Sequence, residues 1–216
     1  PIVGNPNLKV AFNHSLNLNY NNYLQKAKLN YSVGLNSSMV ENSISRNVVQ
    51  IRDEYNSLKN ETRYVKLNGA YRVGGNYSIS KQFANRKYSL SYSGNVSFNH
   101  GVSMSNDLMN YTDSWNFTQR ISPRISPKEW LEVNPSVSYR RSTSNNSLPT
   151  SIDNKNNTVS LGIDGRFIFW KSLIFNYNAS KNFVSGINAN LTNNPFVING
   201  SIQKELFNRK ATVSIE

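Results

Sequence analysis

The sequence predicts an all-β protein: an antiparallel up-and-down transmembrane β-barrel segment of about ten long strands, with short periplasmic turns and longer extracellular loops. Apolar and polar residues alternate with period two along nearly the whole chain, which is typical of strands with two different faces. The alternating stretches are long, and short connections alternate with long ones. Of the 216 residues, 36 are Asn and 30 are Ser, a composition that disfavours helices.

The predicted strands follow one another along the chain. In 88–98, for example, tyrosine, leucine, valine and phenylalanine alternate with serine and asparagine. Several stretches alternate for 11 to 15 residues, whereas globular strands have about five or six and a tilted strand crossing a bilayer needs roughly 9–11. In order, the predicted strands are 8–20, 27–39, 65–79, 88–98, 111–121, 131–139, 158–170, 173–179, 196–202 and 211–215.

The connections fall into two classes, as in outer-membrane barrels, where periplasmic turns are short and extracellular loops are long. Short turns are expected at 21–22, 81–87, 122–128, 170–171 and 207–210. Longer loops, rich in Asn, Ser and Asp, are expected at 41–61, 103–110, 143–157 and 185–194.

Aromatic residues gather beside the short turns, as in the interfacial girdle of a membrane barrel. A general preference of aromatic residues for strands is the alternative explanation. The candidate girdle residues are Tyr20, Tyr23, Phe83, Tyr88, Trp130, Phe169, Trp170 and Phe207.

The other parity is mostly Asn, Ser, Thr and Gly, with scattered charges that would face the lumen of a barrel. A two-layer sandwich in water gives the same alternation, because it buries the apolar parity and exposes the polar one. Strand length, loop asymmetry and the aromatic bands favour the barrel. The candidate lumen-facing residues are Lys9, Lys28, Lys66, Arg72, Arg140, Asp164 and Arg166.

Composition narrows the function classes. The net charge is +12, but the basic residues form no run, so we expect no nucleic-acid partner. No apolar run approaches the roughly 18 residues of a transmembrane helix, and the absence of Cys excludes disulfides and Cys-based metal sites. His14 and His100 have no carboxylate at ligand spacing, so we expect no metal and no cofactor.

Catalysis has one weak candidate in the sequence. His100, Ser103, Ser105 and Asp107 lie close together along the chain, and a hydrolase on the barrel rim would need such groups. With 30 serines such coincidences are frequent, so we expect the chain not to be an enzyme.

Two stretches resemble a known family. Residues 4–20, GNPNLKVAFNHSLNLNY, resemble a segment of TonB-dependent-receptor-like outer-membrane β-barrel proteins of Gram-negative bacteria. The stretches 167–178, FIFWKSLIFNYN, and 193–216, NNPFVINGSIQKELFNRKATVSIE, resemble the end of the same barrel domain. The resemblance implies that 1–216 is part of a single barrel domain, with the plug and the final strand outside this sequence.

The resemblance also implies a function. Such proteins take up scarce nutrients across the bacterial outer membrane, with outer-membrane lipid, their own plug domain, the TonB complex and a surface lipoprotein as partners. This chain would then supply wall, lumen and capture loops, with 41–61, 143–157 and 185–194 as the loops. The alternative is a non-transporting outer-membrane adhesin or structural barrel whose loops bind a partner. The transported substrate is not encoded in any of these motifs.

Overall fold

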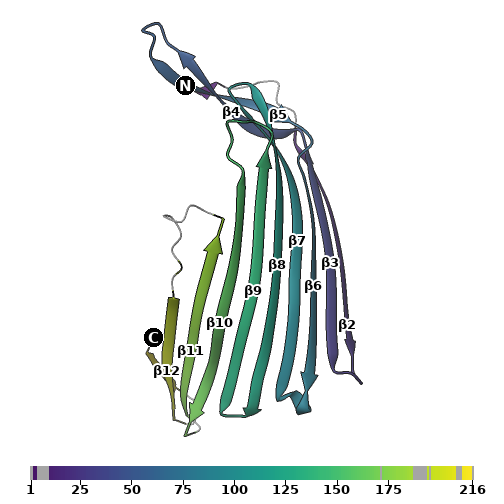
Figure 1. The fold of residues 1–216 in the computed structure, drawn as a ribbon, viewed down its shortest axis with the longest axis vertical. Coiled ribbons are helices and arrows are strands. Elements are labelled where there is room, and N and C mark those ends of the chain that lie inside the picture. Colours follow the sequence, from purple (N-terminus) through teal and green to yellow (C-terminus); the bar gives the residue numbers. More distant parts are fainter. Residues whose placement is uncertain are drawn as a thin grey trace.

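The computed structural model describes residues 2–3, 10–170, 172–186, 194, 196–207 and 211–215. The chain forms one antiparallel up-and-down sheet, so the all-β class predicted from the alternation is confirmed. Figure 1 shows the strands side by side in a single layer, with the short turns at the lower end. No helix among the described residues is long and apolar enough to cross a membrane.

The described sheet has 13 strands, and without β1, β4 and β5 ten of them form a meander of sequential antiparallel neighbours. Each of the ten predicted strands overlaps one strand of this meander. The ten are β2 (Phe12–Leu24), β3 (Leu29–Glu41), β6 (Tyr71–Phe83), β7 (Tyr88–Ser105), β8 (Leu108–Lys128), β9 (Leu131–Asn146), β10 (Asn154–Phe169), β11 (Leu173–Ser185), β12 (Phe196–Leu206) and β13 (Ala211–Ile215).

A second hairpin interrupts the meander between β3 and β6. It consists of β4 (Ser43–Arg52) and β5 (Leu58–Leu67), and it projects beyond the sheet at the end opposite the short turns (Figure 1). β4 pairs in parallel with the end of β7, and β1 (Ile2–Val3) pairs in parallel with β5. The segment 41–61, expected as a loop, is therefore mostly strand.

Two of the predicted short turns lie inside strands, so those predictions are wrong. Residues 21–22 belong to β2, and the turn follows at 25–28. Residues 122–128 belong to β8, and the turn is formed by Glu129 and Trp130. The ladder between β8 and β9 is interrupted between Ile121 and Ile125, and this gap accommodates Pro123, which cannot donate a ladder hydrogen bond.

The predicted long loops are shorter than expected. The segment 103–110 is a tight turn, because β7 runs to Ser105 and β8 begins at Leu108. Asn106 and Asp107 form it with φ of 50° and 62°, a left-handed conformation that these two residue types tolerate. The loop predicted at 143–157 is confined to 147–153, and the one at 185–194 falls largely outside the described residues.

The sheet has no apolar core of its own. Leu67, 6% exposed, is the one buried hydrophobic residue in the described part of the chain, while large apolar side chains along one face are about half exposed. β2 pairs only with β3, and β13 only with β12, among the strands described. The sheet is therefore open, and closure into a barrel stays a prediction.

Candidate functional site

One face of the meander carries a continuous apolar band. Directly opposed residues of neighbouring strands share a face, and such rows join, for example, Leu18 to Leu35 and Val96 to Phe117. On β7 the band runs over 88–98 and on β8 over 115–125. Ten residues of antiparallel strand span about 34 Å, which a tilt of about 40° reduces to about 26 Å. The apolar belt of membrane barrels is about 25 Å tall.

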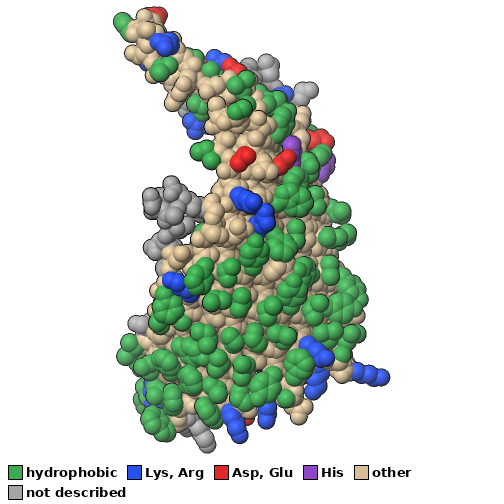
Figure 2. Space-filling view, viewed as in Figure 1, with side chains coloured by type: hydrophobic (Ala, Val, Ile, Leu, Met, Phe, Trp, Pro, Cys, Tyr) green, Lys and Arg blue, Asp and Glu red, His purple; other side chains and the backbone are tan. Residues whose placement is uncertain are grey.

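The space-filling view shows how this band ends. In Figure 2 apolar side chains cover the lower part of the face and Lys and Arg lie along its lower edge, while further Lys and Arg side chains, histidine and acidic side chains lie above it. Arg86 and Lys87 belong to the turn after β6, and Lys128 ends β8 at the same edge. Charges therefore begin where the apolar band ends.

The three tryptophans of the chain lie at the two ends of the band. Trp115, 51% exposed, packs against Phe98 at the upper end, with 4.7 Å between the ring centroids. Trp130 and Trp170 belong to turns at the lower end and are 51% and 83% exposed. Tryptophan favours the interface between hydrocarbon and headgroups, because its ring is apolar and its N–H is polar.

The other candidate girdle residues divide between the faces. Tyr20 lies on the apolar face, where its ring is 5.9 Å from that of Tyr31. Tyr23 lies on the polar face, in one row with Asn30 and Ser80. At the lower end of the sheet, Phe83, Tyr88 and Phe169 end or begin strands and Phe207 lies in a turn.

Gln119 is a polar residue in the middle of the apolar band. It lies opposite Gly94, and the hydroxyl of Tyr77 reaches over this glycine to donate a hydrogen bond to the Gln119 side-chain oxygen. A Cβ at Gly94 would lie 2.6 Å from both the Tyr77 hydroxyl and the amide of Gln119. The glycine is therefore needed to let the tyrosine cover the amide.

The polar face carries a charged cluster centred on Glu132. Arg124 donates to both carboxylate oxygens of Glu132, at 2.9 and 3.1 Å, and Arg166 lies 3.2 Å from one of them. Asn134 bridges Glu132 and Asp164, with donor–acceptor distances of 3.3 and 3.0 Å. These side chains line an open pocket of about 550 Å³ on the polar face.

The candidate lumen-facing residues have different places in the structure. Asp164 and Arg166 belong to this cluster, and Arg72 and Arg140 lie on the same polar face of β6 and β9. Lys28 is in the turn before β3, 3.4 Å from the side-chain oxygen of Asn85, and Lys66 is on the projecting hairpin. Lys9 lies outside the described residues.

Arg124 is one of the cluster members that sequence reasoning missed. The sequence assigned Arg124 to a short turn because Pro123 and Pro127 flank it, whereas it lies within β8. Parity alone does not find it, because Lys128 is opposite Leu131 at the turn, and counting back from there puts Arg124 and Glu132 on different faces. The register shift between Ile125 and Lys128 brings the two side chains onto one face.

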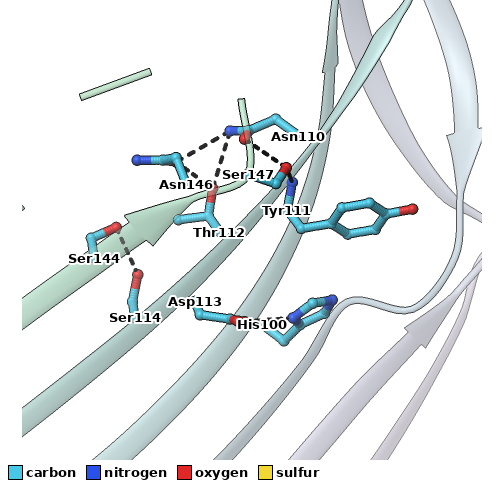
Figure 3. Close-up of polar contacts among 9 residues, drawn as sticks. All are labelled: His100, Asn110, Tyr111, Thr112, Asp113, Ser114, Ser144, Asn146 and Ser147. Carbon is cyan, nitrogen blue, oxygen red and sulfur yellow. Dashed lines mark hydrogen bonds and ion pairs between the residues drawn. The ribbon is translucent and has the colours of Figure 1, made fainter. Parts of the chain in front are cut away.

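A hydrogen-bond network covers the upper end of the polar face (Figure 3). Asn110, 9% exposed, donates to Thr112 and Asn146 at 3.3 and 3.2 Å and accepts from the Ser147 hydroxyl at 3.3 Å. The backbone N–H of Leu148 also donates to Asn110, at 3.2 Å. The network fixes the start of the 147–153 loop against β8.

On the opposite face, His100 Nδ1 forms a hydrogen bond with the Asp113 carboxylate at 2.6 Å (Figure 3). Its ring stacks between those of Tyr71 and Tyr111, at centroid distances of 5.2 and 5.8 Å. The strand alternation puts Ser103 and Ser105 on the other face from His100, and Asp107 binds Asn47 instead. The groups considered for hydrolysis are therefore not brought together.

The projecting hairpin is anchored to the β7–β8 turn by Asn47, the one fully buried side chain among the residues described. Asn47 donates from its side-chain amide to the carboxylate of Asp107 at 2.6 Å and accepts from its backbone N–H at 3.4 Å. Arg63 of β5 lies 3.6 Å from the other oxygen of that carboxylate. These bonds hold the hairpin to the sheet.

The tip of the hairpin is organised by Asp53. Its carboxylate accepts from the backbone N–H groups of Tyr55 and Ser57, at 2.9 and 2.8 Å, and pairs with Lys59 at 2.8 Å. The hydrogen bond from Lys59 and those from the backbone hold the pKa of Asp53 below its ordinary value. Tyr55 is thereby presented to solvent, 87% exposed.

The described residues contain no group of three or more His, Cys, Asp and Glu side chains that could hold a metal ion. No family model, no curated protein and no solved structure matches this chain.

Proposed function

We propose that this chain forms part of the wall of an outer-membrane β-barrel, with its apolar face against lipid and its polar face toward the lumen. The observation that carries the proposal is the apolar band, which extends over 88–98 on β7 and 115–125 on β8 and which no described residue covers. A face of this size exposed to water is rare in monomeric proteins and marks a surface that binds a membrane or another protein. The tryptophans at both ends and the charges at the lower edge favour lipid.

The proposal requires closure of the sheet. Unpaired backbone N–H and C=O groups are very unfavourable in hydrocarbon, so β2 and β13 each need a partner strand in the membrane. We propose that other parts of the same protein supply these strands.

We further propose that the barrel belongs to a TonB-dependent-receptor-like transporter of the bacterial outer membrane, which uses the TonB complex and a plug to take up a nutrient. This proposal is supported by the resemblance of the stretches 4–20, 167–178 and 193–216 to that family. The arginines and amides of the polar face support a water-filled lumen, because such groups are solvated there.

Tryptophan fluorescence tests the membrane proposal. The protein is reconstituted in phospholipid vesicles, with Trp115, Trp130 or Trp170 as the one tryptophan retained. The vesicles contain phospholipids brominated either close to the headgroup or deep in the acyl chain, and bromine quenches nearby tryptophan fluorescence. The lipid brominated close to the headgroup should quench all three tryptophans more strongly, because they lie at the ends of the band. A sheet whose apolar face is covered by protein would show no quenching by either lipid, and this result would overturn the proposal.

The projecting hairpin favours a second candidate function, an adhesin or structural barrel whose loops bind a partner. β4 and β5 present Tyr55 to solvent on a hairpin that Asn47 anchors, which is suited to a binding arm. Deleting 49–60 while keeping the anchor distinguishes the two functions. Nutrient uptake that continues while surface binding is lost favours the adhesin, and the reverse favours the transporter.

A further inference from the structure

Two arginines lie together near the middle of the polar face, away from the Glu132 cluster. Arg120 of β8 is opposite Ser138 of β9, and Arg140 of β9 is opposite Thr118 of β8. The two arginines are therefore diagonal neighbours on one face, with their Cα atoms roughly 7–8 Å apart. Side chains of this length can reach a common point above the sheet.

Hydroxyl groups surround the pair. Ser93 of β7 lies opposite Arg120 on its other side, and Thr158 of β10 lies opposite Arg140. We call these six side chains the arginine patch: Ser93, Thr118, Arg120, Ser138, Arg140 and Thr158. Both arginines are exposed, so a solute on the polar face can reach them.

The side-chain hydrogen bonds that the structure describes on the polar face do not involve the arginine patch. Some polar side chains of this face bond one another across the strands, as in Ser32–Ser78 at 2.7 Å and Ser114–Ser144 at 3.1 Å. Within the described chain, no side chain of the patch forms a side-chain hydrogen bond or an ion pair with another residue. The donors of the patch are therefore available to a ligand.

The charge of the pair is not neutralised by the nearest acids. Glu132 already binds Arg124 and Arg166, and Asp164 accepts from Asn134. Arg120 is opposite Ser138, and Asp164 is opposite Asn134, four residues away along β9. Four residues of strand separate these positions by on the order of 14 Å, which is more than the Debye length of about 8 Å at physiological ionic strength. The patch therefore attracts an anion.

We propose that the arginine patch binds an oxyanion, a phosphate or carboxylate group of a small solute in the proposed lumen. Two guanidinium groups and four hydroxyls offer the charge-assisted hydrogen bonds that such a group accepts. The inference rests on the proposed barrel, because it places the ligand on the lumen side. It adds the chemical class of the solute, which the resemblance leaves open.

Calorimetric titration with inorganic phosphate and with succinate tests the proposal, using the whole protein reconstituted in lipid nanodiscs. Arg120→Gln and Arg140→Gln should each weaken binding about tenfold or more, since each removes a charge-assisted contact. Arg72→Gln is the matched control, because Arg72 lies on the same face and neither neighbouring strand, β3 or β7, contains an arginine, and it should leave binding unchanged. The probe that binds more tightly identifies the ligand group as phosphate or carboxylate.

Three results would overturn the inference. The first is equal binding by wild type, Arg120→Gln and Arg140→Gln, and the second is equal weakening by Arg72→Gln. The third is no binding by wild type together with a lower melting temperature of both patch variants, since an acid from elsewhere in the protein would then occupy the pair. Tryptophan quenching in the same preparation reports on the membrane proposal separately, so failure of one is distinguishable from failure of the other.

Discussion

Replacing Ile79 with Arg places a charge in the middle of the apolar band. Ile79 lies on β6, four residues above Phe83 at the lower end, so it is about 14 Å along the strand and roughly 10 Å above that end. An Arg at the bilayer midplane destabilises a membrane barrel by about 2–4 kcal/mol. Because Ile79 is 46% exposed and lies between Tyr31 and Tyr92, whose hydroxyls can accept from a guanidinium, we expect about 2–3 kcal/mol.

Asn76→Arg is the matched control, because Asn76 is on the same strand at a similar height but on the polar face. We expect it to change stability by less than about 0.5 kcal/mol, as for other exposed polar positions. Equilibrium unfolding by urea in phospholipid vesicles measures both variants. Equal destabilisation by the two substitutions would refute lipid contact of the apolar face, and so would the same Ile79→Arg cost in lipid-free buffer, because a protein layer would then cover this face.

Three further predictions concern the polar face and the hairpin. Glu132→Gln leaves two arginines without their shared carboxylate, and we expect a loss of about 1–3 kcal/mol in urea unfolding, whereas Glu129→Gln in the neighbouring turn should have almost no effect. Asn47→Ala breaks both hydrogen bonds to the β7–β8 turn, so hydrogen exchange over 43–67 should become faster while exchange in β9 is unchanged. Because the pKa of Asp53 is lowered in the folded protein, its ionised carboxylate stabilises the hairpin tip at pH values above the unfolded-state pKa of about 3.9. This stabilisation is lost as the pH falls through the folded-state pKa, so proteolysis at 53–57 should increase in acid. Asp53→Asn should remove this pH dependence.

Alternation predicted the strands well because each residue's face depends only on its neighbours in sequence. It did not predict where one strand ends and the next begins, and this error hid the Glu132 cluster. With the turn at 122–128, Arg124 belongs to no strand, whereas the turn at Glu129 and Trp130, together with the register shift between Ile125 and Lys128, brings it beside Glu132. Proline was read as a turn signal, although an interrupted ladder accommodates it within β8.

The projecting hairpin shows a second limit of sequence reasoning. The stretch 41–61 is rich in polar residues, and its pairing depends on Asn47, whose partner Asp107 lies 60 residues away in the chain. No local pattern reports a contact of that separation. The arginine patch is similar: both arginines are visible in the sequence, but their diagonal placement needs the β8–β9 register.

The insertion of β4 and β5 between β3 and β6 has a consequence for the order of folding. From β6 onward each strand pairs with the next one in the chain, so these hairpins need only short loop closures and can form one after another. Joining β3 to β6 is different, because Leu29 must meet Lys81 across an intervening hairpin. Closing such a loop has a larger entropic cost, which an already formed β4–β5 hairpin reduces by bringing the two strands closer together. We therefore expect the β2–β3 pair to join a sheet that begins at β6, as one of the last steps of assembly.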